Sequence, residues 1–526
     1  MKRLGKFFNS KWGGIVALIT AIGCFLALTL TRITTSSIWF DEAFSAYITK
    51  YNLAEITHYT ALDVHPPLYY WLLKGWTSIF GTSTFAFRSM SIFFGVVTLI
   101  LLFFLVKRLF NRKTAAASVF LVAISPLFVR FGIEARMYTL VTAIVLAATL
   151  MLWRSLRTNK LRDYIIYGVL VCLGMFTHYF TAVVWLSHWL YRIIYLRTNS
   201  LCGRKLAKAY FSKEWIIAHI VAIGLYLPWI PTVISQLHTV SSGFWIPAVT
   251  ANTPSDYLSE FLFYLQGSQT SGWLPVLFFI TVTLLGILIY RYLHQIRYSR
   301  VERRSFYLVL TMAIAPVIFL MLLSLPPLTS SFVDRYVLSA AIFTAVLVAV
   351  LVVNYKSSKA NWWITPTTLT LAIICCFGYG IFQVYHQGNY NKFNGSSVMT
   401  GEVIRAIQQA DHNNTPIISN SPYGYYEASF YDSTEHPTYF LWDSVKNDST
   451  GSLAMLRDNH FNRAVKNISR FANDHHQIWV TGTTSTDTIY APTELNTSGW
   501  KAVRTITISD PVTGNNQYKA TLYDIK

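Results

Sequence analysis

The sequence predicts an all-α polytopic membrane domain followed by a small C-terminal α/β soluble domain. Of the 526 residues, 53% are hydrophobic and only 13% are charged. Apolar runs of about 20 residues, the length that crosses a bilayer as a helix, recur along the chain and stop near Val384. Because backbone polar groups in lipid must be paired within the protein, these spans are expected to be helices.

The apolar runs predict about eleven membrane spans. The first run begins at Gly14; it is too long for a signal peptide and lacks a following small-residue cleavage site, so we treat it as a span. The spans are expected at residues 14–34, 85–106, 114–130, 138–153, 163–180, 182–196, 215–235, 272–292, 305–325, 333–354 and 361–383.

The basic residues predict the orientation of these spans. Of the 43 Lys and Arg residues, 25 fall in the odd-numbered gaps, counting the N-terminus first, and seven fall in the opposite gaps. The positive-inside rule therefore predicts a cytoplasmic N-terminus in a multi-pass protein of the cell membrane. It also puts the loop 35–84 and the tail 384–526 outside the cytoplasm.

The net charge of +19 comes from the cytoplasmic gaps and does not indicate nucleic-acid binding. Residues 1–383 carry 32 basic and 11 acidic side chains, whereas residues 384–526 carry 11 and 13. The partners that such basic loops attract are anionic lipid headgroups. All five cysteines precede the tail, so the sequence predicts no disulfide there, and no spacing suggests a zinc site.

Residues 384–526 are expected to form a separate extracytoplasmic α/β domain. The stretch "GEVIRAIQQADHNN" has helical spacing, and "TPIIS" and "HQIWVTG" are typical of buried strands. The last segment, "VRTITISDPVTGNNQYKATLYDI", predicts a hairpin with "TGNN" at its turn. The tail contains no glycine-rich phosphate loop and no nucleophile elbow, which suggests a supporting or acceptor-recognition role.

The loop between the first two spans carries a pair of acids. "FDEAFSAYITKYNLAEI" predicts an amphipathic helix lying at the membrane interface, with Asp41 and Glu42 in its first turn. Capping and the helix dipole would explain acids at this position. The functional alternative is that two adjacent carboxylates against an apolar wall form a general base or a cation site.

The same loop ends in the motif "LDVHPPLYYW". The two prolines fix the preceding backbone in an extended conformation and favour the start of a helix. The motif is therefore either a simple helix-start turn or a rigid support that holds Asp63 and His65 at fixed positions.

Further polar residues lie at the predicted outer ends of spans. Snorkelling arginines and interfacial aromatic residues would explain each of them singly. Glu134 alternatively pairs with Arg136, and His178 is alternatively a packing residue. Taken together, three arginines suggest a lipid phosphate, which the planar guanidinium binds well. The residues concerned are Arg88, Glu134, Arg136, His178, Asp334, Arg335 and Tyr336.

The ordered set of motifs resembles the GT-C class of membrane glycosyltransferases. It is most similar to the branch of protein O-mannosyltransferases and lipid A aminoarabinose transferases. The motifs are Asp41-Glu42, "DVHPP", "FAFRSMS", "FGIEARMYTL", "FTHYF" and "FVDRYVLSA", and they cover most of residues 1–340. The resemblance implies a polyprenyl-phosphate sugar donor and a catalytic base at the acid after the first span, here Asp41 with Glu42 beside it.

The tail departs from part of that branch. It is not the β-trefoil insert of eukaryotic protein mannosyltransferases, so a protein acceptor is not specifically implied. The transmembrane glycosyltransferase domain is expected at residues 1–383, with the loop 35–84 carrying the site, and the extracytoplasmic domain at residues 384–526.

The expected function is transfer of a hexosyl or pentosyl unit, as in mannosyltransferases, at the outer face. The donor is a polyprenyl-phosphate sugar, the acceptor is a hydroxyl of a lipid, glycan or protein, and one carboxylate base predicts inversion. No cofactor is required, although Asp41 and Glu42 are compatible with a divalent cation. We expect Asp41, Glu42 and Asp63 to be catalytic and substrate to contact His65, Arg88, Glu134, Arg136, His178, Arg335 and Tyr336.

The alternative function is a polytopic lipid or sugar transporter or flippase without transferase activity. Many spans and buried charges fit such a protein. The predicted polar residues, however, gather at one face of the membrane. Transport sites usually lie near the midplane in broken helices.

Overall fold

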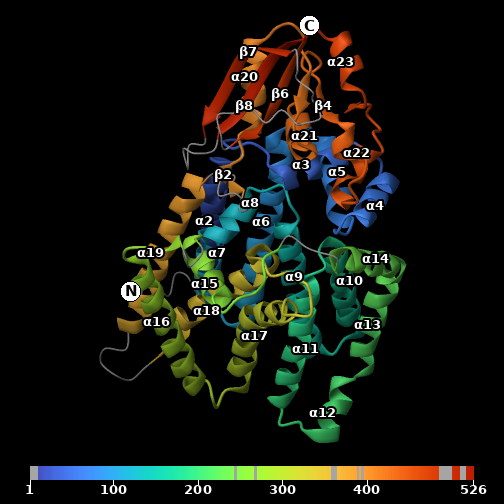
Figure 1. The fold of residues 1–526 in the computed structure, drawn as a ribbon. Coiled ribbons are helices and arrows are strands. Elements are labelled where there is room, and N and C mark those ends of the chain that lie inside the picture. The colour runs from blue at the N-terminus through green and yellow to red at the C-terminus, as the bar shows by residue number, and fades with distance from the viewer. Residues whose placement is uncertain are drawn as a thin grey trace. The chain divides into compact units, whose positions relative to one another are not determined.

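A computed structural model describes residues 10–241, 246–265, 269–356, 364–387, 390–391, 396–484, 500–509 and 517–525. The chain forms two compact units (Figure 1). The helical unit consists of Met1–Thr31 and Arg88–Tyr385, and the mixed unit consists of Arg32–Phe87 and His386–Lys526. The first loop therefore packs with the tail, whereas the expected division had grouped residues 35–84 with the membrane spans.

The helical unit is built from consecutive helices joined by short connections. They are α2 (Lys11–Leu30), α6 (Thr84–Leu109), α7 (Arg112–Ala123), α8 (Pro126–Gly132), α9 (Tyr138–Thr158), α10 (Leu161–Thr177), α11 (Thr181–Arg197), α12 (Gly203–Tyr210), α13 (Lys213–Tyr226), η1 (Leu227–Trp229), α14 (Ile230–Ser241), α15 (Thr253–Phe263), α16 (Leu274–Gln295), α17 (Arg300–Leu322), η3 (Asp334–Val337), α18 (Leu338–Asn354) and α19 (Ile364–Gln387).

Each of the eleven expected spans corresponds to a helix or to a broken helix in this series. Within the described residues, eight helices are long and apolar enough to cross a membrane, or nine if the bent pair α7–α8 counts as one span. Helices α10 and α11 have 17 residues each, the lower end of the crossing range. The fold is thus that of a multi-pass membrane protein.

Proline explains the break inside the third expected span. Helices α7 and α8 differ in direction by 63°, and Pro126 is the first residue of α8. Proline has no backbone N–H and pushes the residue before it out of the helical conformation. Ser125 is accordingly extended, with ψ of 128°. The break starts a short helix, α8, which carries Arg130, and Glu134 lies in the turn after it.

Helix α18 is the most enclosed helix of the described spans. All residues from Leu338 to Leu351 are buried, and α18 contacts α7, α9 and α17. Its sequence is apolar on every side, which is typical of a helix surrounded by other helices. The short η3 helix precedes α18 directly, so Arg335 and Tyr336 are carried by the end of a rigid central element.

The mixed unit contains a six-stranded sheet with strand order β5-β4-β3-β6-β8-β7. Strands β5, β4, β3 and β6 are parallel, and β8 pairs antiparallel with both β6 and β7. The strands are β3 (Ile417–Ser419), β4 (Thr438–Leu441), β5 (Ala464–Val465), β6 (Gln477–Thr484), β7 (Trp500–Ser509) and β8 (Gln517–Ile525), and a separate pair is β1 (Tyr390–Asn391) and β2 (Ser396–Ser397).

The helices of the mixed unit come from two segments that are far apart in sequence, the first loop and the tail. They are α3 (Phe40–Ile48), α4 (Leu53–Leu62) and α5 (Leu68–Phe80) from the first loop, and α20 (Thr400–Ala410), α21 (Pro422–Phe430), α22 (Ala454–Arg457) and α23 (Ile468–Asp474) from the tail, with the short helices η4 (Trp442–Ser444) and η5 (Gly451–Leu453). The expected α/β tail is confirmed, and the predicted "TGNN" turn lies outside the described residues.

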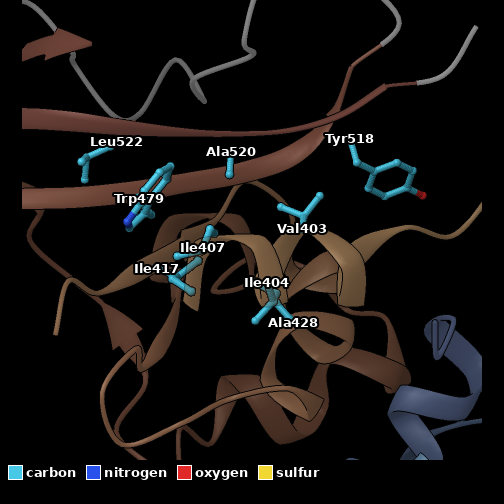
Figure 2. Packing of buried hydrophobic residues seen from close by; sticks show 9 residues of the cluster. All are labelled: Val403, Ile404, Ile407, Ile417, Ala428, Trp479, Tyr518, Ala520 and Leu522. Atoms are coloured by element: carbon cyan, nitrogen blue, oxygen red, sulfur yellow. The ribbon is translucent and has the colours of Figure 1, made fainter. Parts of the chain in front are cut away.

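A hydrophobic core joins α20 to the sheet, as Figure 2 shows. Val403, Ile404 and Ile407 lie on one face of α20, at the helical spacing that the sequence predicted, and are fully buried. They pack with Trp479 of β6 and with the apolar side chains of β8. Burying several aliphatic side chains contributes about 1.5–3 kcal/mol for each, which anchors α20 to the sheet.

Helix α3 packs its aromatic face on α21 of the tail. The Phe40 ring lies 5.1 Å from the Tyr423 ring and the Tyr47 ring lies 5.0 Å from the Tyr426 ring, both edge to face. The apolar face of an amphipathic helix must be buried against another surface, and the sequence predicted that this surface would be the membrane interface. The structure supplies aromatic side chains of the tail instead.

Candidate functional site

The acid pair lies at the beginning of α3, as predicted. Asp41 and Glu42 occupy the first turn, where the partial positive charge of the helix end stabilises carboxylates. Glu42 is completely buried and Asp41 is half-buried. The N-cap residue is Trp39, whose indole has no capping acceptor, so neither acid occupies the N-cap position itself.

The second acid of the loop contacts the predicted histidine. Asp63 ends α4, and its Oδ2 lies 2.9 Å from Nδ1 of His65. Helix α5 begins at Leu68, directly after the two prolines. The side chains of Asp63 and His65 are only 11% and 19% exposed. A carboxylate at Nδ1 fixes the orientation of the imidazole, as in sites that move protons.

Among the described residues, no group of three or more His, Cys, Asp and Glu side chains is arranged to hold a metal ion. A divalent cation at Asp41 and Glu42 stays a prediction.

In the helical unit, Glu134 pairs with an arginine that the sequence analysis did not select. Its Oε2 lies 2.8 Å from Nη1 of Arg130, and both side chains are buried. Arg130 Nε also donates to the Tyr264 hydroxyl at 3.0 Å. The expected alternative paired Glu134 with Arg136, and the backbone N–H of Arg136 donates to the Glu134 carbonyl at 2.7 Å.

Arg88 and Arg136 are also buried in the helical unit, at 1% and 2% exposure. Ser91, one turn after Arg88 on α6, donates to the carbonyl of Glu134 at 2.6 Å. The motifs "FAFRSMS" and "FGIEARMYTL" are thus brought together by a hydrogen bond between α6 and the turn after α8. Burial of this depth argues against simple snorkelling, because a snorkelling arginine extends its head to water.

A pocket in the helical unit gathers three of the predicted residues. Its basic and phenolic side chains are His178, Arg335, Tyr336 and Tyr138, and aliphatic side chains from α9, α11 and α18 also line it. The full lining consists of Tyr138, Val141, Thr142, His178, Phe180, Thr181, Val184, Arg335, Tyr336, Leu338 and Ser339.

Aromatic contacts hold the pocket residues in place. The Tyr336 ring lies 4.6 Å from the His178 ring and stacks on Phe180 at 4.7 Å. The backbone N–H of Phe180 donates to Nδ1 of His178 at 3.3 Å, so the ring proton of neutral His178 resides on Nε2. The guanidinium of Arg335 lies 5.8 Å from the Tyr336 ring centre. The pocket therefore combines a fixed cation and hydrogen-bond donors with an apolar lining.

The structure thus distributes the predicted residues over four groups, two in each unit. Asp41 and Glu42 share the first turn of α3, and Asp63 contacts His65, all in the mixed unit. The helical unit contains the buried group with Arg88, Glu134 and Arg136, and the pocket with His178, Arg335 and Tyr336. Asp334, beside this pocket in η3, is buried.

Sequence reasoning missed Arg130, Tyr138 and Glu427. The spacing of Arg130 and Glu134, four residues apart, was a usable signal, because such residues are neighbours on a helix. Tyr138 lies two positions after Arg136 in the motif "FGIEARMYTL", and this proximity to a selected residue was a usable signal. Glu427 offered none, because its partners Phe40 and Thr400 come from distant segments.

Comparison with known proteins supports the fold. Residues 64–231 match the family described as dolichyl-phosphate-mannose-protein mannosyltransferase. The structure is similar to ArnT from Cupriavidus metallidurans bound to undecaprenyl phosphate, with a TM-score of 0.57 at 12% identity, over 97% of this chain and 98% of that chain. The apo state of that ArnT gives a TM-score of 0.56 at 11% identity, over 96% and 97% of the two chains. No curated protein matches the chain by sequence.

A weaker likeness is to the oligosaccharyltransferase of Archaeoglobus fulgidus in its apo form, with a TM-score of 0.49 at 11% identity, over 90% of this chain and 70% of that chain. The family match includes His65, Arg88 and His178 and ends before Arg335. The likeness to ArnT extends over nearly the whole chain, the C-terminal sheet included. Fold and family match together confirm the resemblance that the ordered motifs predicted: this chain has the architecture of a GT-C class membrane glycosyltransferase.

Proposed function

We propose that the protein transfers a sugar from a polyprenyl-phosphate donor to an acceptor hydroxyl at the outer face of the membrane, with inversion. The observation that carries this proposal is the pocket with Arg335 and His178, which joins anion-binding groups to an apolar lining within the membrane-spanning unit. The ArnT structure with a similar fold contains undecaprenyl phosphate, a ligand of this chemical class.

The pocket presents groups suited to the phosphate of such a donor. A phosphate needs charge-assisted hydrogen bonds, and Arg335 with the Nε2–H of His178 can provide them. Val141, Val184 and Leu338 add apolar side chains beside these phosphate-binding groups. As the bond from sugar to phosphate breaks, negative charge grows on the leaving phosphate, and a preorganised arginine stabilises that charge. The leaving group therefore needs no general acid.

The acceptor hydroxyl must lose a proton as it attacks. Asp41 is the proposed general base, with Glu42 beside it in the first turn of α3. The oxygen of the acceptor forms a bond to the anomeric carbon while the bond to phosphate breaks, and the proton passes to Asp41. A single displacement of this kind inverts the anomeric configuration. Asp63 and His65 are proposed to support this step as a hydrogen-bonded pair.

We further propose that the N-terminus is cytoplasmic and that residues 384–526 are extracytoplasmic, which follows from the distribution of basic residues. The transferred unit is proposed to be a hexose or pentose such as mannose, and the acceptor a lipid, a glycan or a protein. Residues Arg88, Glu134 and Arg136 are proposed to shape the donor site, with Arg130 neutralising Glu134.

The proposal is tested with purified protein, polyprenyl-phosphate mannose, polyprenyl-phosphate pentose and a mixture of candidate acceptors. Release of polyprenyl phosphate, dependent on the acceptor and absent in the Asp41→Asn variant, is the expected result. Binding of the lipid without release would favour a flippase or transporter. Hydrolysis that does not depend on an acceptor would contradict the assignment as a transferase.

A further inference from the structure

The N-terminus of α3 receives its cap from the tail of the chain. The backbone N–H of Phe40 donates to the carboxylate of Glu427 on α21, and the Thr400 hydroxyl donates to the same carboxylate at 2.5 Å. The first N–H groups of a helix lack partners within the helix, and a side-chain oxygen usually satisfies them from the N-cap position. Trp39 cannot do so, and Glu427 takes this role from about 390 residues away in sequence.

The segment leading into α3 is held by further contacts with the tail. The Tyr431 hydroxyl accepts from the backbone N–H of Ile38 at 2.9 Å, and the Ser37 hydroxyl accepts from the N–H of Gly401 at 2.9 Å. Ser37 also donates to Glu402 of α20. These contacts hold Ser37 and Ile38, just before α3, to the tail, so the α3 N-terminus has little freedom to move without breaking them.

We infer that Glu427 is a positioning residue that fixes the first turn of α3, and with it Asp41 and Glu42, for transfer. This inference rests on the proposed function, in which Asp41 is the base. It gives the C-terminal domain a specific task, because the domain supplies the carboxylate that holds the α3 N-terminus. Glu427 acts through Phe40 and the helix rather than on substrate.

The electrostatics of this position make the cap sensitive to pH near neutrality. Burial raises the pKa of the Glu427 carboxyl to about 7, and the bonds from Thr400 and from the Phe40 N–H oppose the rise. An ionised carboxylate accepts a stronger hydrogen bond than a protonated one, so the cap tightens as pH rises through about 7. The other charged or titratable groups on the packed elements and their ends are Asp41, Glu42, Tyr47, Glu402, Arg405, Tyr423, Tyr425, Tyr426 and Tyr431.

The test compares Glu427→Ala, Glu427→Gln and the control Glu435→Ala, an exposed acid of the same unit. Each is assayed for kcat and for KM of the lipid donor between pH 5.5 and 8.5, with Asp41→Asn in parallel; the interval brackets the pKa of about 7. In Glu427→Ala we expect kcat to fall roughly ten- to hundredfold, the cost of misplacing a catalytic group. KM should change little. Glu427→Gln keeps an acceptor oxygen and should recover most of kcat, without the wild-type change near pH 7.

The outcomes separate the inference from the function on which it rests. Full kcat in folded Glu427→Ala beside an inactive Asp41→Asn would overturn the inference alone. Full kcat in Asp41→Asn would overturn the proposed role of Asp41 first. If Glu427→Ala does not fold, Glu427→Gln decides, because an unchanged pH profile of kcat in that variant contradicts the inference. A fall in Glu435→Ala equal to that in Glu427→Ala would also contradict it.

Discussion

The rings of His178 and Tyr336 lie 4.6 Å apart, although His178 precedes α11 and Tyr336 precedes the distant helix α18. His178 ends α10 and Tyr336 lies in η3, immediately before the central helix α18. The Phe180 ring stacks on Tyr336 at 4.7 Å and lies 5.7 Å from the His178 ring, so the three rings form one cluster. Packed rings have little side-chain freedom left to lose when a ligand binds. This contact is therefore expected to preorganise the hydrogen-bond donors beside Arg335 for the proposed phosphate.

Arg335 is expected to bind the donor phosphate. Arg335→Ala should weaken donor affinity about ten- to hundredfold, because a hydrogen bond to a charged group contributes roughly 1.5–3 kcal/mol. Arg335→Lys should recover only part, since lysine lacks the planar bidentate fork. The measurement is donor affinity, with the exposed Arg300→Ala as control. Unchanged affinity in folded Arg335→Ala would show that Arg335 has only a packing role.

Asp41 is expected to be the base of the transfer step. Asp41→Asn keeps the shape of the side chain and removes its basicity, so turnover should fall roughly 10²–10⁴-fold, the usual contribution of a general base. Donor affinity should stay near its wild-type value, since the proposal puts phosphate binding on Arg335 and His178. The measurements are transfer rate, donor affinity and thermal unfolding. A near-normal transfer rate in a folded variant would exclude Asp41 as the base and leave Glu42 and Asp63 as the candidates.

The orientation of the chain is expected to put the tail outside the cytoplasm. Two single-cysteine variants test this, one with Thr434→Cys in the tail and one retaining Cys202, and both positions are exposed. An impermeant thiol reagent should label Thr434→Cys in intact cells. Cys202, in a predicted inner loop, should react only after permeabilisation. The reverse pattern would refute the predicted topology and the outer-face reaction with it.

Gly451 of the tail approaches the Asp63 turn too closely for a side chain. A Cβ there would lie 2.0 Å from the Leu62 carbonyl oxygen and 2.7 Å from the Asp63 Cα. Because both are backbone atoms, Gly451→Ala must displace the turn, and overpacking of this kind typically costs about 1–3 kcal/mol. We expect lower thermal stability and slower transfer.

The matched control for that variant is Gly75→Ala. Gly75 lies inside α5 of the same unit, and a Cβ there meets nothing within 4 Å. Alanine in a helix interior should stabilise by about 0.5–1 kcal/mol relative to glycine. Equal stability and equal transfer rates for Gly451→Ala and Gly75→Ala would contradict the tight contact between the tail and the Asp63 turn.

The sequence by itself determined the elements whose signals are local. Apolar runs predicted a helix at each expected span, the spacing of Val403, Ile404 and Ile407 predicted α20, and the two prolines predicted the turn before α5. The positions of Asp41 and Glu42 in a first helical turn were also predicted, because amphipathic spacing and helix-start signals extend over only a few residues.

The tertiary structure alone decided which surfaces cover these elements. The apolar face of α3 could pack on lipid or on protein, and only the folded chain puts Tyr423 and Tyr426 against it. Likewise, the bond between Ile38 and Tyr431 joins residues 393 positions apart, and the cap from Glu427 is similarly distant. Such pairings depend on packing and burial summed over whole units. The hydrophobic periodicity of one segment shows which face is apolar but does not identify the segment that packs on it.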